Sequence, residues 1–239
     1  MFPHSHFCEK ARWALDYKGV PYRVVALLPL LHGFTVRRHA PKTTVPVLLT
    51  NGQVIQGSSE IIDHVDELVA VRRLTPTDGA ELEEGRRLEA WASVHLGDHL
   101  RRLLYDRLLA WPEFICRCFG HGMSASKRTL LRAYYPLLRL GVYRVFVGGP
   151  EKVERSRHEF ASAMDHLAKV LDGRSYLVGD SFSRVDLSVA SLLSLLAVPP
   201  EHPLPFGEIP DEGARAFMDG YRDHPVTRWT LDMYAKHRR

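Results

Sequence analysis

The chain has 239 residues, of which 45% are hydrophobic and 25% charged, and its formal net charge is +4 at pH 7. It is long enough for one large domain or two modest ones. Basic and acidic residues are interspersed, which gives little reason to expect a nucleic-acid partner. No apolar run approaches the roughly 18 residues that cross a bilayer, and the N-terminus lacks a secretory signal pattern. With only three cysteines as well, we expect a cytoplasmic protein without a disulfide framework or a membrane partner.

The first 43 residues predict one helix and one strand. Apolar residues recur at helical spacing over residues 5–18, and Gly19 is a plausible C-terminal stop. The segment Tyr22–Leu28 is rich in β-forming residues. Residues 29–43 contain prolines and a glycine, so we expect an irregular connection with at most a short helix.

The next segment predicts a β-hairpin followed by a helix. Two short apolar runs, Val45–Leu49 and Gln53–Ile55, flank Asn51-Gly52, a dipeptide that readily supplies the two positive φ angles of a tight turn. Pro46 suits the start of a strand because it cannot donate to a ladder. Ser58 precedes a helical apolar pattern, so we expect its hydroxyl to cap that helix. The resulting order is α/β and occupies residues 1–75.

From residue 79 onward no stretch alternates as a strand does, and we expect an all-α domain over residues 79–239. The expected helices span about 79–110, 125–146, 151–172, 183–197, 211–222 and 225–237. Ser183 and Asp186 have the spacing of a capping box, and Phe182 and Leu187 that of a hydrophobic staple. These signals describe how one helix begins and carry no chemistry of their own.

Taken together, these motifs resemble the cytosolic glutathione transferase family, with a thioredoxin-like N-terminal domain and an all-helical C-terminal domain. Val45-Pro46 is similar to the family's Val-Pro step, which implies a cis proline and a backbone that pairs with glutathione. Ser58 is similar to the serine that holds the γ-glutamyl carboxylate, and residues 179–186 resemble the folding motif of the helical domain. The resemblance implies glutathione as co-substrate, no permanently bound cofactor and a homodimer.

The turn Ser5-His6-Phe7-Cys8 resembles the family's active-site turn. By this resemblance Ser5 is the catalytic residue, whose hydroxyl would stabilise the glutathione thiolate with help from the following helix N-terminus. Cys8 is an alternative thiol. Thr44, Val45, Pro46, Gly57 and Ser58 are the residues expected to bind glutathione.

Three features depart from the family pattern. Gly57 stands where an acid or glutamine usually precedes the serine, and Thr44 stands where glycine usually precedes the Val-Pro step. The family's first strand lies inside the sheet, but only Met1 to His4 precede Ser5 here, fewer than the about five or six residues of an ordinary strand. We therefore expect a first strand that is short or missing.

Simpler interpretations remain open for several residues. Ser5 could be a helix cap only, Cys8 a buried filler, and His4 and His6 members of a solvent-facing turn. Cys116 and Cys118 are separated by one residue, unlike the common zinc pairs, so no metal site is expected.

The leading hypothesis is an enzyme that conjugates reduced glutathione to small, apolar electrophiles. The alternatives are a non-catalytic member that binds glutathione or a protein, and a thiol oxidoreductase that uses Cys8.

Overall fold

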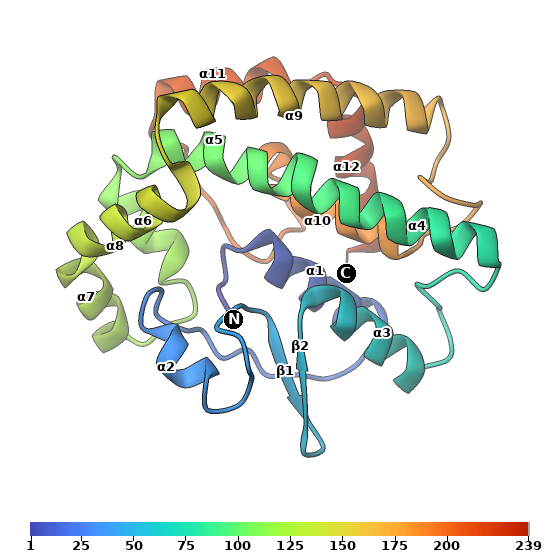
Figure 1. Cartoon of the computed structure of the whole chain (residues 1–239), viewed down its shortest axis with the longest axis horizontal. Coiled ribbons are helices and arrows are strands. Elements are labelled where there is room, and N and C mark those ends of the chain that lie inside the picture. Colours follow the sequence, from blue (N-terminus) through green and yellow to red (C-terminus); the bar gives the residue numbers. More distant parts are fainter. Residues whose placement is uncertain (239) are drawn as a thin grey trace.

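The computed structural model describes residues 1–238 and shows an α/β part followed by a helical part (Figure 1). The α/β part contains α1 (His6–Tyr17), α2 (His32–Val36), β1 (Val47–Thr50), β2 (Gln53–Gln56) and α3 (Ser58–Leu68). In the view of Figure 1 this part lies below the helices that follow it.

The hairpin predicted around Asn51-Gly52 is confirmed. β1 and β2 are antiparallel, with Thr50 opposite Gln53 and Val47 opposite Gln56. Asn51 and Gly52 have φ angles of 46° and 76°, the pair of positive values that a two-residue type I′ turn requires.

The strand expected at Tyr22–Leu28 is not formed, which corrects that prediction. The two-stranded sheet β1-β2 is the only sheet within residues 1–238. Within residues 1–238, the backbone of residues 22–28 has hydrogen bonds only to Met1: the Met1 amino group donates to the Val25 carbonyl at 2.8 Å, and the Leu27 amide donates to the Met1 carbonyl at 3.1 Å. A β-prone segment becomes a strand only when a neighbouring strand takes up its backbone groups.

The helical part begins at Gly79, as predicted, but is more finely divided than the sequence indicated. It contains α4 (Gly79–Ala92), the π-helical η1 (Ser93–Asp98), α5 (His99–Leu108), α6 (Pro112–Phe119), α7 (Ala125–Ala133), α8 (Tyr135–Val142), the π-helical η2 (Tyr143–Val147), α9 (Pro150–Leu171), α10 (Arg184–Ala197), α11 (Glu212–Gly220) and α12 (Pro225–His237). The sequence analysis missed α6, which starts with Pro112 in the first turn, where proline costs no hydrogen bond. No helix within residues 1–238 is long and apolar enough to cross a membrane.

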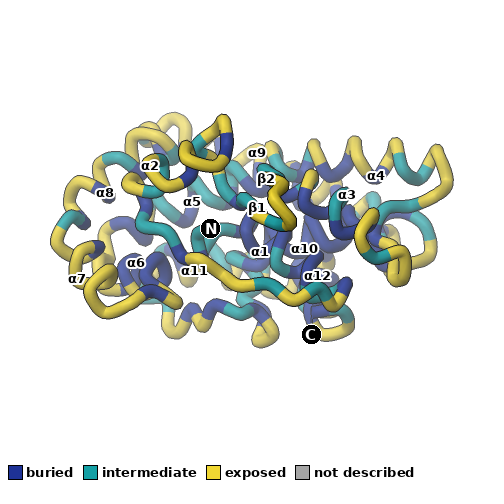
Figure 2. Tube along the Cα trace, turned by 90° about the horizontal axis from the view of Figure 1, so that it is seen from below, coloured by how far each residue is buried: buried dark blue, intermediate teal, exposed yellow. Residues whose placement is uncertain are grey.

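The core is centred on α10, which packs against α1, α4 and α12. Figure 2 shows α1 and α10 as mostly buried, whereas α7 and the hairpin tip are exposed. The capping box predicted for α10 is confirmed: the Ser183 amide donates to Asp186 Oδ2 at 2.9 Å, and the Leu177 amide donates to Oδ1 at 2.8 Å. One buried carboxylate thus fixes both the start of α10 and the chain that leads into it.

A buried ionic network joins the two parts of the chain. Glu89 of α4 lies between Lys10 of α1 and Arg184 of α10; Arg184 Nε donates to Glu89 Oε2 at 2.7 Å. Ser59 of α3 donates to Glu89 Oε1 at 2.6 Å, and Arg184 also pairs with Asp63 of α3. Burial alone would raise the pKa of Glu89, but the Lys10 and Arg184 cations outweigh it and lower the pKa to about 2.

A second buried pair fastens the connection that leads to the helical part. Lys18 Nζ, at the end of α1, donates to Asp66 Oδ1 at 2.8 Å and to the Val71 carbonyl at 2.9 Å. Asp66 in turn accepts from the amides of Leu74 at 3.0 Å and Thr75 at 2.7 Å. These bonds hold α1, α3 and the linker in one arrangement.

The π-helical segment η1 contains a glycine that the packing requires. A Cβ atom on Gly97 would lie 2.7 Å from Leu192 Cδ2 and 3.4 Å from His6 Nε2.

Because Leu192 is fully buried, we expect Gly97→Ala to lower the free energy of unfolding by about 1–3 kcal/mol through overpacking, measured by urea denaturation. The matched control is Gly85→Ala in α4, where a Cβ meets nothing within 4 Å. This control should be neutral or slightly stabilising, and equal losses in the two variants would contradict the overpacking argument.

The low pKa of Glu89 predicts how the network responds to pH. The gap between about 2 and the ordinary 4.5 corresponds to about 3 kcal/mol of the free energy of unfolding. Because this carboxyl has a lowered pKa in the folded state, its contribution is fully present above pH 4.5 and is lost as the pH falls toward 2. We expect the difference between the parent chain and Glu89→Gln to shrink over that range in urea titrations.

Asp63→Asn is the control for this titration. Asp63 contacts the same Arg184, but its side chain is 39% exposed, so its removal should cost at most about 1 kcal/mol. A pH-independent Glu89→Gln difference would show that the loss comes from packing and not from charge.

Candidate functional site

Ser5 lies at the N-terminus of α1. It is the N-cap of the helix, with φ −83° and ψ 121°, and its hydroxyl accepts the Cys8 amide at 3.4 Å. This is a long hydrogen bond, and the hydroxyl proton is not consumed by it. Ser5 is half-buried, so its donor can reach a group placed at the positive end of α1.

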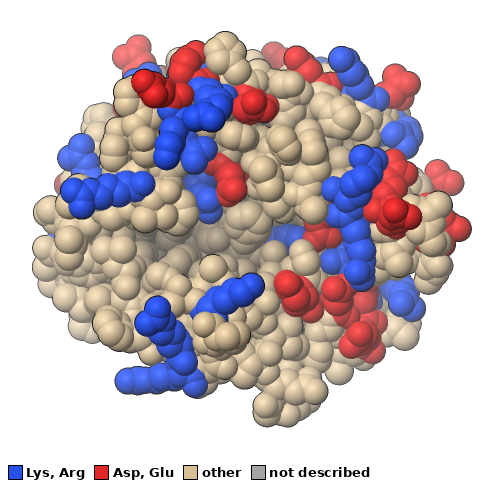
Figure 3. Space-filling model, in the orientation of Figure 1, with Lys and Arg blue, Asp and Glu red and all other residues tan. Residues whose placement is uncertain are grey.

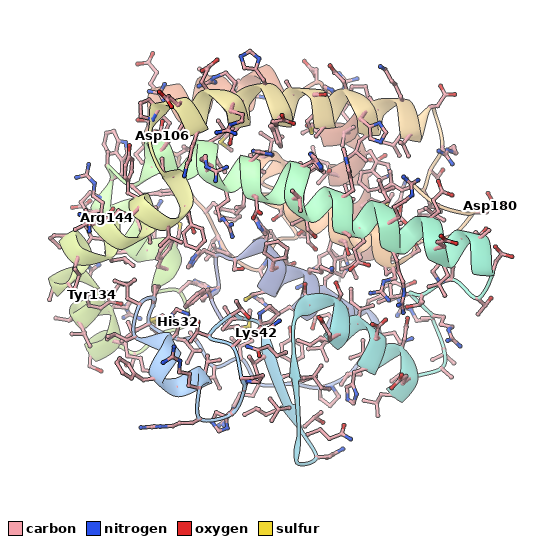
Figure 4. The ribbon with its side chains drawn as sticks, viewed as in Figure 1. His32, Lys42, Asp106, Tyr134, Arg144 and Asp180 are labelled. Atoms are coloured by element: carbon pink, nitrogen blue, oxygen red, sulfur yellow. The ribbon has the colours of Figure 1, made fainter. Side chains whose placement is uncertain are left out.

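The second element is the turn that leads into β1. The Val45-Pro46 peptide bond is cis, as the resemblance implied, and the Pro46 carbonyl accepts the Gly57 amide at 3.1 Å. The Gln56 carboxamide donates to the carbonyls of Lys42 and Thr44, each at 2.8 Å. Gln56 therefore holds the loop beside Val45. Figure 4 shows Lys42 in this loop, close to β1.

The third element is the start of α3, where one prediction was wrong. We expected the Ser58 hydroxyl to cap this helix, but Gly57 is the N-cap, with φ 118°, and Ser58 is the first helical residue without a capping bond. Glycine adopts that φ without strain. Ser58 is 8% exposed, and the helix end beside it is a position that favours an anion.

Glu60 compensates for the missing side chain at position 57. A Cβ atom on Gly57 would collide with the Glu60 carboxylate. The acidic group therefore occupies the space where a side chain at position 57 would begin. The sequence contained this residue, but only the folded backbone shows that it reaches back over Gly57.

His4 and His6 do not form the solvent-facing turn that the sequence suggested. The His4 ring stacks on Phe119 with centroids 3.5 Å apart, and His6 is 2% exposed and packs edge-on to Phe7. Burial lowers the pKa of both imidazoles to about 3, and for His6 the nearby Arg101 charge adds to this effect. Both rings are neutral at pH 7, so they add no charge beside Ser5.

Cys8 points into the protein. Its side chain is fully buried, and burial raises the pKa of its thiol despite the hydrogen bond to Ser5. A buried thiol with a raised pKa is a poor nucleophile, because the thiolate is the reactive form. This environment disfavours the thiol-exchange alternative and agrees with the filler interpretation.

The face that contains these elements is hollowed between the two parts of the chain. Figure 3 shows a recess across its middle, between the α/β part and the helices above, at the level where α1 crosses in Figure 1. A hydrogen bond joins the two parts: Tyr134, after α7, donates to the Pro29 carbonyl at 2.9 Å. Figure 4 places Tyr134 on the same side of the molecule as His32 of α2.

One group of side chains within residues 1–238 could hold a metal ion. The donor atoms of His95, His99 and Glu159 lie within 4.8 Å of one another. His99 Nδ1 is 2.8 Å from Ser156 Oγ, which leaves the other ring nitrogen for a ligand. Cys116 and Cys118 are free thiols that are both 4% exposed, and both are buried within α6.

The comparisons with known proteins agree with the motifs. The model of the glutathione S-transferase N-terminal domain matches residues 1–73. A curated relative, glutathione S-transferase TCHQD of Arabidopsis thaliana, is 24% identical over 208 residues, which cover 82% of this chain and 75% of that protein.

The structural comparisons extend this likeness to almost the whole chain. A glutathione S-transferase from Rhodospirillum rubrum F11 superposes with a TM-score of 0.66 at 18% identity, covering 99% of this chain and 86% of that one. A glutathione S-transferase from Methylobacillus flagellatus KT with glutathione bound superposes with a TM-score of 0.64 at 18% identity, covering 97% and 91%.

The fold is therefore that of a glutathione transferase-like protein, in which an incomplete thioredoxin-like part precedes an all-helical part. The family model over residues 1–73, the curated relatives and the structural neighbours all support a likeness to the glutathione S-transferase family.

Proposed function

We propose that the chain binds reduced glutathione and conjugates it to small, apolar electrophiles, with Ser5 as the residue that stabilises the thiolate. The observation that carries the proposal is the conjunction of Ser5 at the N-cap of α1, the cis Val45-Pro46 bond and the open start of α3 at Ser58. A structural neighbour with this fold contains glutathione.

The chemistry follows from the surroundings of Ser5. A thiolate is the nucleophile, and a hydroxyl donor together with the positive end of a helix lowers the pKa of a nearby thiol. The buried His4 and His6 side chains are uncharged at pH 7, and a hydrogen bond from Ser5 is stronger in such buried surroundings than in water. The thiolate would then attack an electrophile held in the recess of Figure 3.

The remaining glutathione contacts would come from the second and third elements. The backbone of Val45, flanked by Thr44 and Pro46, would pair with the cysteinyl part of the tripeptide. Ser58 and the free amides of α3, next to Gly57, would receive the α-carboxylate of the γ-glutamyl group. Glu60 would receive the neighbouring α-ammonium group, because its carboxylate lies over Gly57.

Two further parts of the proposal concern partners. We propose a two-fold homodimer and a cytoplasmic location, with glutathione as a co-substrate and no permanent cofactor.

The competing function is a non-catalytic glutathione-binding protein, favoured by the small two-stranded sheet and by the use of Ser5 as a cap.

Turnover by Ser5→Ala separates these two functions. Loss of the donor should raise the pKa of bound glutathione, so that turnover with a general electrophile such as 1-chloro-2,4-dinitrobenzene falls about 10-fold or more at pH 6.5. Glutathione affinity from calorimetry should change little. The pH profile of turnover should move to higher pH, which a merely structural role would not produce.

The control for Ser5→Ala is Ser124→Ala. Ser124 caps α7, accepting the Lys127 amide at the same 3.4 Å, so this variant loses an equivalent cap of about 1 kcal/mol away from the site. Equal turnover in the parent chain and Ser5→Ala would remove Ser5 from the mechanism. Glutathione binding without turnover in the parent chain would favour the non-catalytic function.

The role of Glu60 is tested with a matched pair of ligands. Glu60→Gln should weaken glutathione binding by about 5- to 150-fold, since a charge-assisted hydrogen bond contributes about 1–3 kcal/mol. Glu60→Gln should leave unchanged the weaker binding of a glutathione analogue that lacks the α-amino group. The measurement is calorimetry of both ligands with both chains; an equal loss for the two ligands would show that Glu60 acts without contacting the ammonium group.

A further inference from the structure

One end of the folded chain carries basic residues without acidic ones. Residues 29–59 contain Arg37, Arg38 and Lys42 but no Asp or Glu, and residues 114–150 contain six Lys or Arg and again no Asp or Glu. Because the whole chain has a net charge of only +4, the remainder is net acidic. The balanced overall composition conceals this asymmetry, and the fold concentrates it by bringing the two basic segments together.

Direct contacts join these two segments. A Cβ atom on Gly141 of α8 would lie 3.2 Å from Leu30 Cδ2, and Tyr134 donates to the Pro29 carbonyl. Leu137 lies one helical turn before Gly141, so it is on the side of α8 that Leu30 meets. Figure 1 shows α2 on the same side of the molecule as α7 and α8, and over this lower left part Figure 3 shows basic but no acidic groups.

The same end exposes large apolar side chains. Phe34 in α2 is 74% exposed, and Leu137 in α8 is 62% exposed. A single exposed leucine is ordinary, but a group of them on neighbouring elements marks a surface that meets another molecule or another phase. We call this surface the α2–α8 face, and its exposed apolar members are Leu30, Leu31, Phe34, Leu137 and Leu140.

A partner for the α2–α8 face must satisfy both the cations and the apolar side chains. A second copy related by a two-fold axis would place the same cations opposite one another, which is repulsive. A nucleic acid would pair with the cations but leave the apolar side chains without a partner. A partner helix needs a groove, whereas Phe34 and Leu137 are mostly in solvent. The surface of an anionic bilayer offers phosphates and an acyl boundary together.

We propose that the α2–α8 face is a peripheral docking surface for a bilayer that contains anionic lipids. The apolar members enter the boundary between headgroups and acyl chains. Four exposed cations beside them, Arg37, Arg38, Arg139 and Arg144, pair with the lipid phosphates. Figure 4 places Arg144 at this end of the molecule. A contact of this kind needs no membrane-spanning helix and suits the proposed cytoplasmic location, because the cytoplasmic leaflet carries anionic lipids.

The test is co-sedimentation of the full chain with large unilamellar vesicles. We expect binding to phosphatidylcholine vesicles that contain about 30 mol% phosphatidylglycerol, and at least about 10-fold weaker binding to pure phosphatidylcholine, because each cation near an anionic surface contributes about a factor of five. Binding should also weaken as the salt concentration rises from about 0.05 to 0.5 M. No binding to the anionic vesicles, or equal binding to both kinds, would overturn the proposal.

The double variant Phe34→Ser/Leu137→Ser tests the apolar contact. It should weaken binding to the anionic vesicles by about 10-fold or more, because two side chains that enter the bilayer are lost. Its melting temperature should stay close to that of the parent chain, since both side chains are exposed. The matched control is Val71→Ser/Val94→Ser, which replaces two exposed valines elsewhere and should bind as the parent does. Equal weakening in the two variants would contradict insertion of this face.

A second pair of variants separates the position of the charges from their number. Arg37→Gln/Arg144→Gln should weaken binding to the anionic vesicles by about 10-fold or more. Arg87→Gln/Arg155→Gln changes the net charge equally at exposed positions of α4 and α9, and it should weaken binding by less than about 2-fold. Equal losses would show that the overall charge binds the vesicles and that the α2–α8 face does not.

Two further measurements identify the other partners if vesicles fail to bind. Binding to a short DNA duplex that survives Phe34→Ser/Leu137→Ser would assign the cations to nucleic acid and overturn the proposal. Dimerisation in sedimentation velocity that the same variant abolishes would assign the α2–α8 face to a second copy, and it would equally overturn the proposal.

Discussion

The buried contact of Glu89 with Lys10 and Arg184 is the constraint on which the arrangement of the site depends. Each residue belongs to a different helix, and Ser59 and Asp63 add α3 to the same network. An ionised group in a protein interior is tolerated only when its partners are in place. The network therefore admits few relative positions of α1, α3, α4 and α10, and two of these helices, α1 and α3, carry the proposed glutathione contacts at their N-termini.

The ionic network also explains why α1 can carry a site at its first turn. The last turn of α1 is held by Lys18 on Asp66, and its buried face by Lys10 and by Glu9, which pairs with Arg238 at 2.8 Å. The N-terminal turn, from Ser5, is thus the end of a helix whose remaining length is fixed. Because the helix is held in place, the Ser5 hydroxyl can act as a donor without a further entropic cost of ordering.

Local signals in the sequence were sufficient for the elements that local physics determines. Asn51-Gly52 specified the hairpin, and the spacing of Ser183 and Asp186 specified the start of α10, because each depends on residues at most three positions apart. The ionic network could not be found this way, since Lys10 and Glu89 are 79 residues apart. The Ser58 prediction failed for a different reason, because the local signal was ambiguous: Gly57 takes the cap position by its φ, and Glu60 fills the adjacent space.

The missing strand at residues 22–28 shows that β-propensity alone does not predict a strand. The residues there are β-prone, yet within residues 1–238 the segment pairs with Met1 alone. Strand formation needs neighbouring strands that take up the backbone donors and acceptors on each edge. The helix predictions did not meet this difficulty, because a helix satisfies its backbone within its own segment.

A cavity of about 570 Å³, lined by parts of α1, α3 and β1, shares a short stretch of chain with the proposed glutathione site. Met1 lies at the cavity and Ser5 at the start of α1, and the Ser5 amide donates to the Phe2 carbonyl at 3.2 Å. Val45 and Pro46 line the cavity from the other side while forming the second element of the site. The wall of the cavity and the residues that would hold the thiol of glutathione therefore share the same few backbone groups. Packing of this wall and the geometry of the proposed site are coupled for that reason, because a site is only as well positioned as the residues that support it.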